Sequence, residues 1–462
     1  MNLSLLKDAR TRSFLAYAAI QFLATMDPYF RKHLPLELFH LIMAVITLVV
    51  IGCAYYLLKH SFIDAQSKAP LSRTAIIRLA TITGLMSEVL TFALFFLQAK
   101  FGAKFGYAIH AVPTIAVAIM IAAFFAWMWT APDKAGFVVT GVCLLYAAVM
   151  LLTIYSFPLA EKRSDMLPLI DNALDNLLNG KLPYEVYHMQ SGKIPLTYLP
   201  GMWLPHLPLS ALGLDARMTQ MFCNIFSALL IYHAFKQRAL WFTILLITAW
   251  LLNPWLQYRH EIYLGPYILA TSATLYFIAR DRFTAATLAF GYSAITYQFS
   301  WILAPVFCMY IFNTQGLRSA LRTLIIFGVI GIIGFGPFLV WNRAGFMNGV
   351  FGHWENAFVA PAVNLTFWLS KIIPHTWFQI IQLIVLGACY VFAWLNMKSK
   401  PGFARWMAFT LASFILFNRL IWHYFFFPVC LYFVYGMLMS TAEKSLSTQT
   451  DESDRHEKSY LT

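Results

Sequence analysis

Charged residues are scarce in this chain. Only 11% of its 462 residues are Asp, Glu, Lys or Arg, whereas ordinary globular proteins contain about 25%. Hydrophobic residues make up 60% of the chain, and the mean hydropathy is +0.65. This composition excludes an ordinary soluble protein and predicts one that crosses a membrane several times.

Strands of alternating apolar and polar residues are also missing, which argues against a β-barrel. Long apolar runs satisfy their backbone hydrogen bonds in lipid only as helices, each of about 20 residues. We therefore expect an all-α, polytopic transmembrane bundle of about 12–14 helices with large extracytoplasmic loops. The apolar runs lie near 13–26, 36–58, 74–98, 106–131, 136–158, 216–235, 239–255, 263–279, 283–297, 300–313, 322–341, 376–396, 404–418 and 421–440.

Common cofactor and metal motifs are absent. The six cysteines lie in apolar runs without CxxC or Cys/His spacing, so neither a disulfide framework nor a zinc site is indicated. The chain lacks GxGxxG, Walker A, HExxH and GxSxG contexts, which removes the usual soluble-enzyme interpretations. No cofactor is expected, and a divalent metal remains an open alternative.

The net charge of +13 reflects basic connections between apolar runs. In a membrane protein this pattern indicates orientation and not a nucleic-acid partner, because cytoplasmic loops are rich in Lys and Arg. Four such connections fall on one side if the helices alternate: 236–238, 280–282, 313–322 and 397–405. The segments 159–215, 255–263, 342–375 and 418–424 then converge on the extracytoplasmic face.

The segment 159–215 is polar and rich in proline. Within it, residues 165–179 place apolar side chains at helical spacing with acids and amides opposite, which predicts an amphipathic helix on the membrane surface. Prolines are too frequent for a helix in the following residues, so we expect them to run along the bilayer boundary. Residues 441–462 have little apolar content and are expected to form a disordered cytoplasmic tail.

The order of these features carries a family resemblance. The helix 136–158 leads into a loop containing GKLPYEVY and IPLTYLPGMWL, and GFGPFLVWNRAGFMNGVFGHW opens a second large loop at the end of helix 322–341. Residues 285–307 also fit a pair of short helices. This arrangement resembles the GT-C class of integral membrane glycosyltransferases, especially the bacterial mannosyltransferase-like branch that uses polyprenyl-phosphate sugars.

The resemblance implies an organisation and an activity. Residues 136–341 would form a seven-helix module with its first extracytoplasmic loop at 159–215, followed by the second loop and C-terminal helices at 342–440. Residues 1–135 would add transmembrane helices of open role. The protein would lie in the bacterial inner (plasma) membrane with membrane lipid around it, and would transfer a sugar from a polyprenyl-phosphate donor to a lipid-linked or cell-envelope glycan acceptor.

Such a transfer needs a base for the acceptor hydroxyl. The resemblance assigns this role to Asp165, with Glu161 as the second candidate. The alternative for Asp165 is a helix cap formed together with Ser164. Asp171 and Asp175 are expected on the solvated face of the surface helix.

The departing phosphate needs hydrogen-bond donors, for which Arg is well suited. The candidates beside apolar segments on the outer face are Arg259, His260, Arg343, His353, Arg419 and His423. Each could instead extend to lipid head groups. Aromatic candidates for a sugar or lipid groove are Tyr184, Tyr187, Tyr198 and Trp203, and the alternative for them is an interfacial aromatic belt.

Two other functions remain as alternatives. A glycan polymerase or ligase would use a diphosphate-linked oligosaccharide, and a lipid or solute transporter would form no covalent product. Transporters usually place ionisable groups near the bilayer midplane. In this sequence the charges cluster at helix ends, which favours the transferase.

Overall fold

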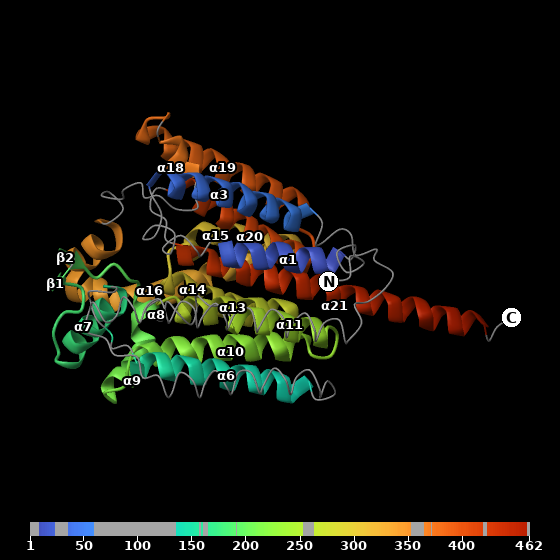
Figure 1. Cartoon of the computed structure of the whole chain (residues 1–462), viewed down its shortest axis with the longest axis horizontal. Helices are drawn as coiled ribbons and strands as arrows, with labels where there is room; N and C mark the ends of the chain where they lie inside the picture. Colours follow the sequence, from blue (N-terminus) through green and yellow to red (C-terminus); the bar gives the residue numbers. More distant parts are fainter. Residues whose placement is uncertain are drawn as a thin grey trace.

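A computed structural model describes residues 9–23, 36–59, 135–156, 159, 165–190, 192–252, 263–352, 365–370, 372–418 and 423–459. Its long helices lie side by side along the long axis of the molecule (Figure 1). Five described helices are long and apolar enough to cross a membrane: Gly136–Tyr155, Arg217–Phe235, Leu317–Gly352, Trp377–Asn396 and Phe426–Glu443. The fold is thus that of a helical membrane protein. The predicted helices at 74–98 and 106–131 lie outside the described residues.

The first part of the described chain places its helices around a short polar region. In order, the elements are α1 (Ala9–Leu23), α3 (Leu36–Lys59), α6 (Ala135–Ser156), α7 (Met166–Leu178), β1 (Val186–Met189), β2 (Gly192–Pro195), α8 (Pro200–Trp203), η3 (Leu204–His206) and α9 (Leu207–Ala211).

The second part supplies most of the bundle. Its elements are α10 (Arg217–Phe235), α11 (Leu240–Leu251), α13 (Gly265–Ala279), α14 (Phe283–Thr296), α15 (Phe299–Gln315), α16 (Leu317–Met347), η4 (Asn348–Gly352), α18 (Leu365–Leu369), α19 (His375–Asn396), α20 (Lys400–Phe417), η5 (His423–Phe425) and α21 (Phe426–Ser459). Helix α13 packs between α10 and α14, and α20 packs along α21.

The predicted surface helix is present as α7, at the end of the bundle that also carries the β-strands (Figure 1). Its buried residues are Leu167, Pro168, Leu169, Ile170, Ala173 and Leu174, which matches the apolar spacing in the sequence. Asp175 is exposed as expected, but Asp171 is half-buried. The helix ends before Gly180, whose φ of 68° favours glycine.

Part of the segment after α7 forms two short strands, which the sequence did not predict. It forms an antiparallel hairpin in which Val186 pairs with Pro195 and Met189 pairs with Gly192. Four-residue strands are too short for alternation to show in the sequence. Gly192 has a φ of 127° at the start of the second strand, a conformation that suits glycine at a tight turn.

Two predicted boundaries also shift. The second large loop was expected from residue 342, but α16 continues past a kink at Asn342 (φ −150°, ψ 79°) to Met347. Helix α21 continues to Ser459, so the expected disordered tail from 441 is helical as far as that residue.

The four basic connections meet at one end of the bundle. Arg280 Nη2 donates to His233 O at 2.6 Å, and Lys400 Nζ contacts Asp281 Oδ2 at 2.5 Å. Asn313 Nδ2 donates to Trp394 O at 3.3 Å. These bonds place the helix ends that carry the connections 236–238, 280–282, 313–322 and 397–405 at one end of the bundle, as the charge pattern predicts.

Candidate functional site

The polar segments gather at the opposite end of the bundle. Tyr198 from the 159–215 segment packs on Tyr263 with ring centroids 4.4 Å apart, and Tyr263 packs on Tyr424 at 5.9 Å. Tyr263 is the last residue of the predicted 255–263 segment, and Tyr424 is the last residue of the predicted 418–424 segment. Asn342, at the start of the predicted second loop, donates to Tyr184 O. The described parts of all four predicted segments therefore meet.

Asp165 is close to these tyrosines. It occupies the N-cap position of α7, but its side chain makes no capping hydrogen bond. Its negative charge adds to the burial that raises the pKa of Tyr198 and of Tyr263, the latter to about 12. The next residue, Met166, accepts a 3.2 Å hydrogen bond from Tyr424 OH through its sulfur. The Asp165 charge thus acts on Tyr198 and Tyr263, and the neighbouring residue Met166 bonds to Tyr424.

These tyrosines keep their protons at neutral pH. Burial is the largest cause of the raised pKa of Tyr263, and hydrogen bonds from Tyr297 and Tyr424 oppose it. Tyr263 OH and Tyr297 OH lie 3.3 Å apart. Neutral hydroxyls can donate to the oxygens of a sugar or phosphate, whereas the Asp165 carboxylate can accept a proton. We call Asp165, Tyr198, Tyr263, Tyr297 and Tyr424 the tyrosine cluster.

Tyr184 and Trp203 form the packed base of this end. Tyr184 OH donates to Tyr198 O at 2.8 Å and accepts from Trp203 Nε1 at 3.2 Å. Its ring lies edge-on to Phe338 and Phe346, with centroids 5.4 and 4.9 Å away. Tyr184 is 2% exposed and Trp203 0%. Both were expected to line a substrate groove, but their burial makes them packing residues.

Tyr187 attaches the hairpin to the surface helix. Its hydroxyl donates to Pro183 O at 2.6 Å and accepts from Asn176 Nδ2 at 3.1 Å. Burial raises its pKa to about 12, against the opposing effect of the Asn176 hydrogen bond. Of the four aromatic candidates, Tyr198 is the one whose ring packs on Tyr263, in the tyrosine cluster.

A buried histidine connects the loop to two helices. His206 is fully buried, with Nδ1 3.1 Å from Ala216 O. Because a carbonyl oxygen only accepts, Nδ1 carries the proton and Nε2 accepts from Gln220 Nε2 at 3.3 Å. Gln220 Oε1 in turn accepts from Gly265 N at 2.5 Å. Burial lowers the His206 pKa to about 4, so the ring is neutral near pH 7.

A buried ion pair lies at the start of α10. Arg217 is 1% exposed and binds both carboxylate oxygens of Asp215, at 2.8 Å from Nε and 2.6 Å from Nη2. Its Nη2 also donates to Ile154 O at 3.2 Å. Burial, followed by the charges of Asp215 and Asp175, raises the Asp171 pKa to about 7, while Arg217 opposes the rise. The sequence contained no pattern that singled out this arginine.

The structure describes only some of the predicted site residues. Arg343 follows the Asn342 kink and is exposed, and His423 begins η5 next to Tyr424. The others lie outside the described residues: Glu161, Arg259, His260, His353 and Arg419. Sequence reasoning missed Tyr263 and Tyr424 as individual residues, although it selected the turns that carry them.

Metal ligands are not grouped in the part of the chain that the structure describes, where no three His, Cys, Asp or Glu residues could hold an ion together.

No protein-family model and no curated protein sequence matches this chain. Function must therefore be argued from the site itself.

Proposed function

We propose that this protein is an inverting membrane glycosyltransferase. It moves a sugar from a polyprenyl-phosphate donor to a lipid-linked or cell-envelope glycan at the extracytoplasmic face. The observation that carries the proposal is the position of Asp165, whose charge acts on Tyr198 and Tyr263 and whose side chain forms no capping hydrogen bond on its helix. A helix-capping role, the main alternative for this residue, lacks the hydrogen bond that defines it.

The proposed reaction is a single displacement. The acceptor hydroxyl gives its proton to the Asp165 carboxylate while its oxygen attacks the anomeric carbon. The bond between that carbon and the donor phosphate oxygen breaks, and the electron pair leaves with polyprenyl phosphate. Tyr198 and Tyr263 would orient the reacting groups through neutral hydroxyl donors.

The phosphate would be held by cations at the same end of the bundle. In support, Arg343 follows the Asn342 kink and His423 begins η5. Arg259, His260, His353 and Arg419 remain proposed partners from the same turns. Arginine suits this role because its planar fork binds two phosphate oxygens at once.

A GT-C-like fold is part of the proposal. Helix α6 is followed directly by the polar segment with its surface helix, and α16 ends in the second polar segment. This order agrees with residues 136–341 acting as a seven-helix module. The cell location proposed for it is the bacterial inner (plasma) membrane, with the tyrosine cluster on the outer face.

The test is sugar transfer by the purified protein from a radiolabelled polyprenyl-phosphate sugar. Product formation from this donor supports the proposal. Product formed only from a diphosphate-linked oligosaccharide would instead identify a polymerase or ligase. Movement of substrate across sealed vesicles without any covalent product would identify a transporter.

A further inference from the structure

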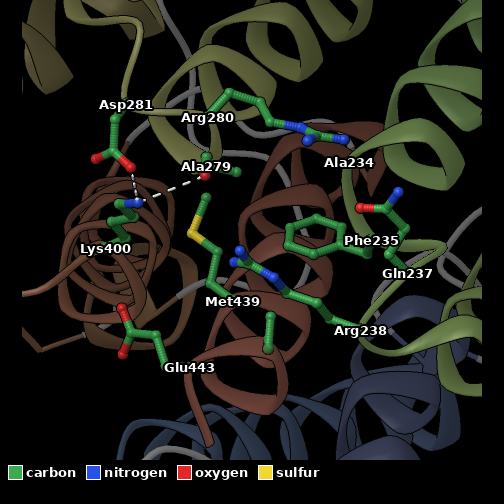
Figure 2. Close-up of a pocket in the computed structure, with 11 residues that line it drawn as sticks. Ala234, Phe235, Gln237, Arg238, Ala279, Arg280, Asp281, Lys400, Met439 and Glu443 are labelled. Carbon is green, nitrogen blue, oxygen red and sulfur yellow. Dashed lines mark hydrogen bonds and ion pairs between the residues drawn. The ribbon is translucent and has the colours of Figure 1, made fainter. Parts of the chain in front are cut away.

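A cavity of about 230 Å³ lies at the basic end of the bundle (Figure 2). It is formed where α10 and α13 end, where α20 begins and where α21 passes. Helix α10 begins at Arg217 and ends at Phe235. Phe235 lines the cavity, whereas Arg217 does not. A helix of 19 residues spans about 28 Å, so this cavity is separate from the tyrosine cluster.

Charge is divided across the cavity. Figure 2 shows Asp281, Lys400 and Glu443 on one side, Arg280 extending toward Ala234, and the Arg238 side chain running beside Phe235 toward Met439. Lys400 Nζ is committed to Asp281 Oδ2 at 2.5 Å and lies 3.5 Å from Ala279 O. The charge of Lys400 is thereby paired with the Asp281 carboxylate.

The two arginines retain donors for a ligand. Arg238 is exposed, and no ion pair or hydrogen bond with another described residue engages its side chain. Arg280 uses Nη2 for His233 O at 2.6 Å and lies over the Tyr276 ring at 6.0 Å. A guanidinium group carries five N–H donors, so one bond leaves Arg280 able to bind a second partner.

We propose that this cavity binds a phosphate group through Arg238 and Arg280. Guanidinium groups match the geometry of phosphate oxygens, and three basic side chains against two acidic ones leave the lining positive. Phe235 and Met439 add an apolar wall, which suits the glycerol region of a lipid. The volume is several times that of a water molecule, about 30 Å³, and accommodates a phosphate.

The phosphate has two sources with the same chemistry. One is the head group of an anionic phospholipid, because basic segments at the cytoplasmic surface attract such lipids. The other is a free phosphate compound. The site does not depend on the transferase activity, since its residues lie at the other end of α10.

The test compares binding to two matched double variants of the full-length protein in detergent. R238Q/R280Q removes the two proposed donors. K236Q/R282Q removes the same net charge from the same two turns, and neither residue lines the cavity. Binding of dioctanoyl phosphatidylglycerol, dioctanoylglycerol and inorganic phosphate is followed by thermal shift and by native mass spectrometry.

We expect R238Q/R280Q to bind the phospholipid about tenfold more weakly or worse, with K236Q/R282Q within about twofold of the wild type. R238Q alone must also weaken binding, and this exposed side chain is not needed for folding. If inorganic phosphate competes with dioctanoyl phosphatidylglycerol, the natural ligand is a free phosphate compound. If it does not compete, the natural ligand is a phospholipid. Equal affinity in the two double variants, or equally tight binding of dioctanoylglycerol, would overturn the proposal.

Discussion

Asn342 and Tyr184 lie 158 positions apart, yet the Asn342 amide donates a 3.0 Å hydrogen bond to the Tyr184 carbonyl oxygen. The same side chain accepts from Gly345 N at 2.9 Å through Oδ1. One asparagine thus joins the kink of α16 to the segment that leads into the hairpin. This bond holds the second polar segment against the first.

Asn342→Ala should therefore destabilise the protein by about 1–2 kcal/mol, because it leaves Tyr184 O and Gly345 N without this partner. Thermal unfolding in detergent measures the change. Asn396→Ala is the control, since Asn396 is exposed and donates within its own helix to Phe392 O. Equal losses in the two variants would contradict the bridging role.

Gly345 and Gly349 lie against the 159–215 segment where no side chain fits. A Cβ at Gly345 would meet Tyr184 O, and one at Gly349 would meet Leu196 O. Gly345→Ala should lower the free energy of unfolding by about 1–3 kcal/mol through overpacking. Gly331→Ala on the same helix meets open space and should be neutral or stabilising, because alanine favours helix. A harmless Gly345→Ala would show that the two segments do not pack as described.

The Asp215–Arg217 pair should be far more important for stability than the Lys400–Asp281 pair. Asp215→Asn removes the carboxylate that the almost fully buried Arg217 guanidinium binds through two nitrogens, at a cost of about 3–5 kcal/mol. Asp281 is 62% exposed, so Asp281→Asn should cost less than about 1 kcal/mol. Denaturant or thermal unfolding compares the two. Similar losses would show that Arg217 is not buried as found.

The shifted pKa values of His206 and Asp171 should make the stability of the protein depend on pH in opposite directions. His206 has its pKa lowered to about 4; between about 6.5 and 4 the unfolded state binds the proton and the folded state does not, so stability falls as pH falls. Asp171 has its pKa raised to about 7; between about 3.8 and 7 the folded state holds the proton, so stability falls as pH rises.

Asp171→Asn should accordingly stabilise the protein at pH 8 relative to wild type and have little effect at pH 4. Unfolding temperatures across this range measure the difference, with Glu185→Gln, at an exposed position after the same helix, as the control. A constant difference between variant and wild type at all pH values would contradict the raised pKa of Asp171.

The sequence predicted those features that depend on local pattern. Apolar runs located the described spanning helices, and the spacing of Leu169, Ile170, Ala173 and Leu174 predicted α7. Basic residues in the connections predicted that Arg280 and Lys400 would lie at the same end. The apolar spacing of a helix and the basic residues of a loop can both be read from neighbouring residues, because helix periodicity determines which side chains are buried and loop charge determines orientation.

Features that depend on tertiary contacts were not predictable. Tyr198, Tyr263 and Tyr424 come together only after three distant segments have packed, and single aromatic residues at a membrane boundary carry no information about their partners. The burial of Tyr184 follows from Phe338 and Phe346, which lie far along the chain. The continuation of α16 beyond Asn342 likewise depends on the bond from that side chain to the loop.

The central claim is that Asp165 accepts the acceptor's proton. Transfer from a radiolabelled polyprenyl-phosphate sugar is measured for purified wild type, Asp165→Asn and Asp175→Asn, where both changes remove one charge from the region of α7. Asp165→Asn should lower kcat by about 100-fold or more, while Asp175→Asn should retain activity. Undiminished transfer by Asp165→Asn would contradict this claim.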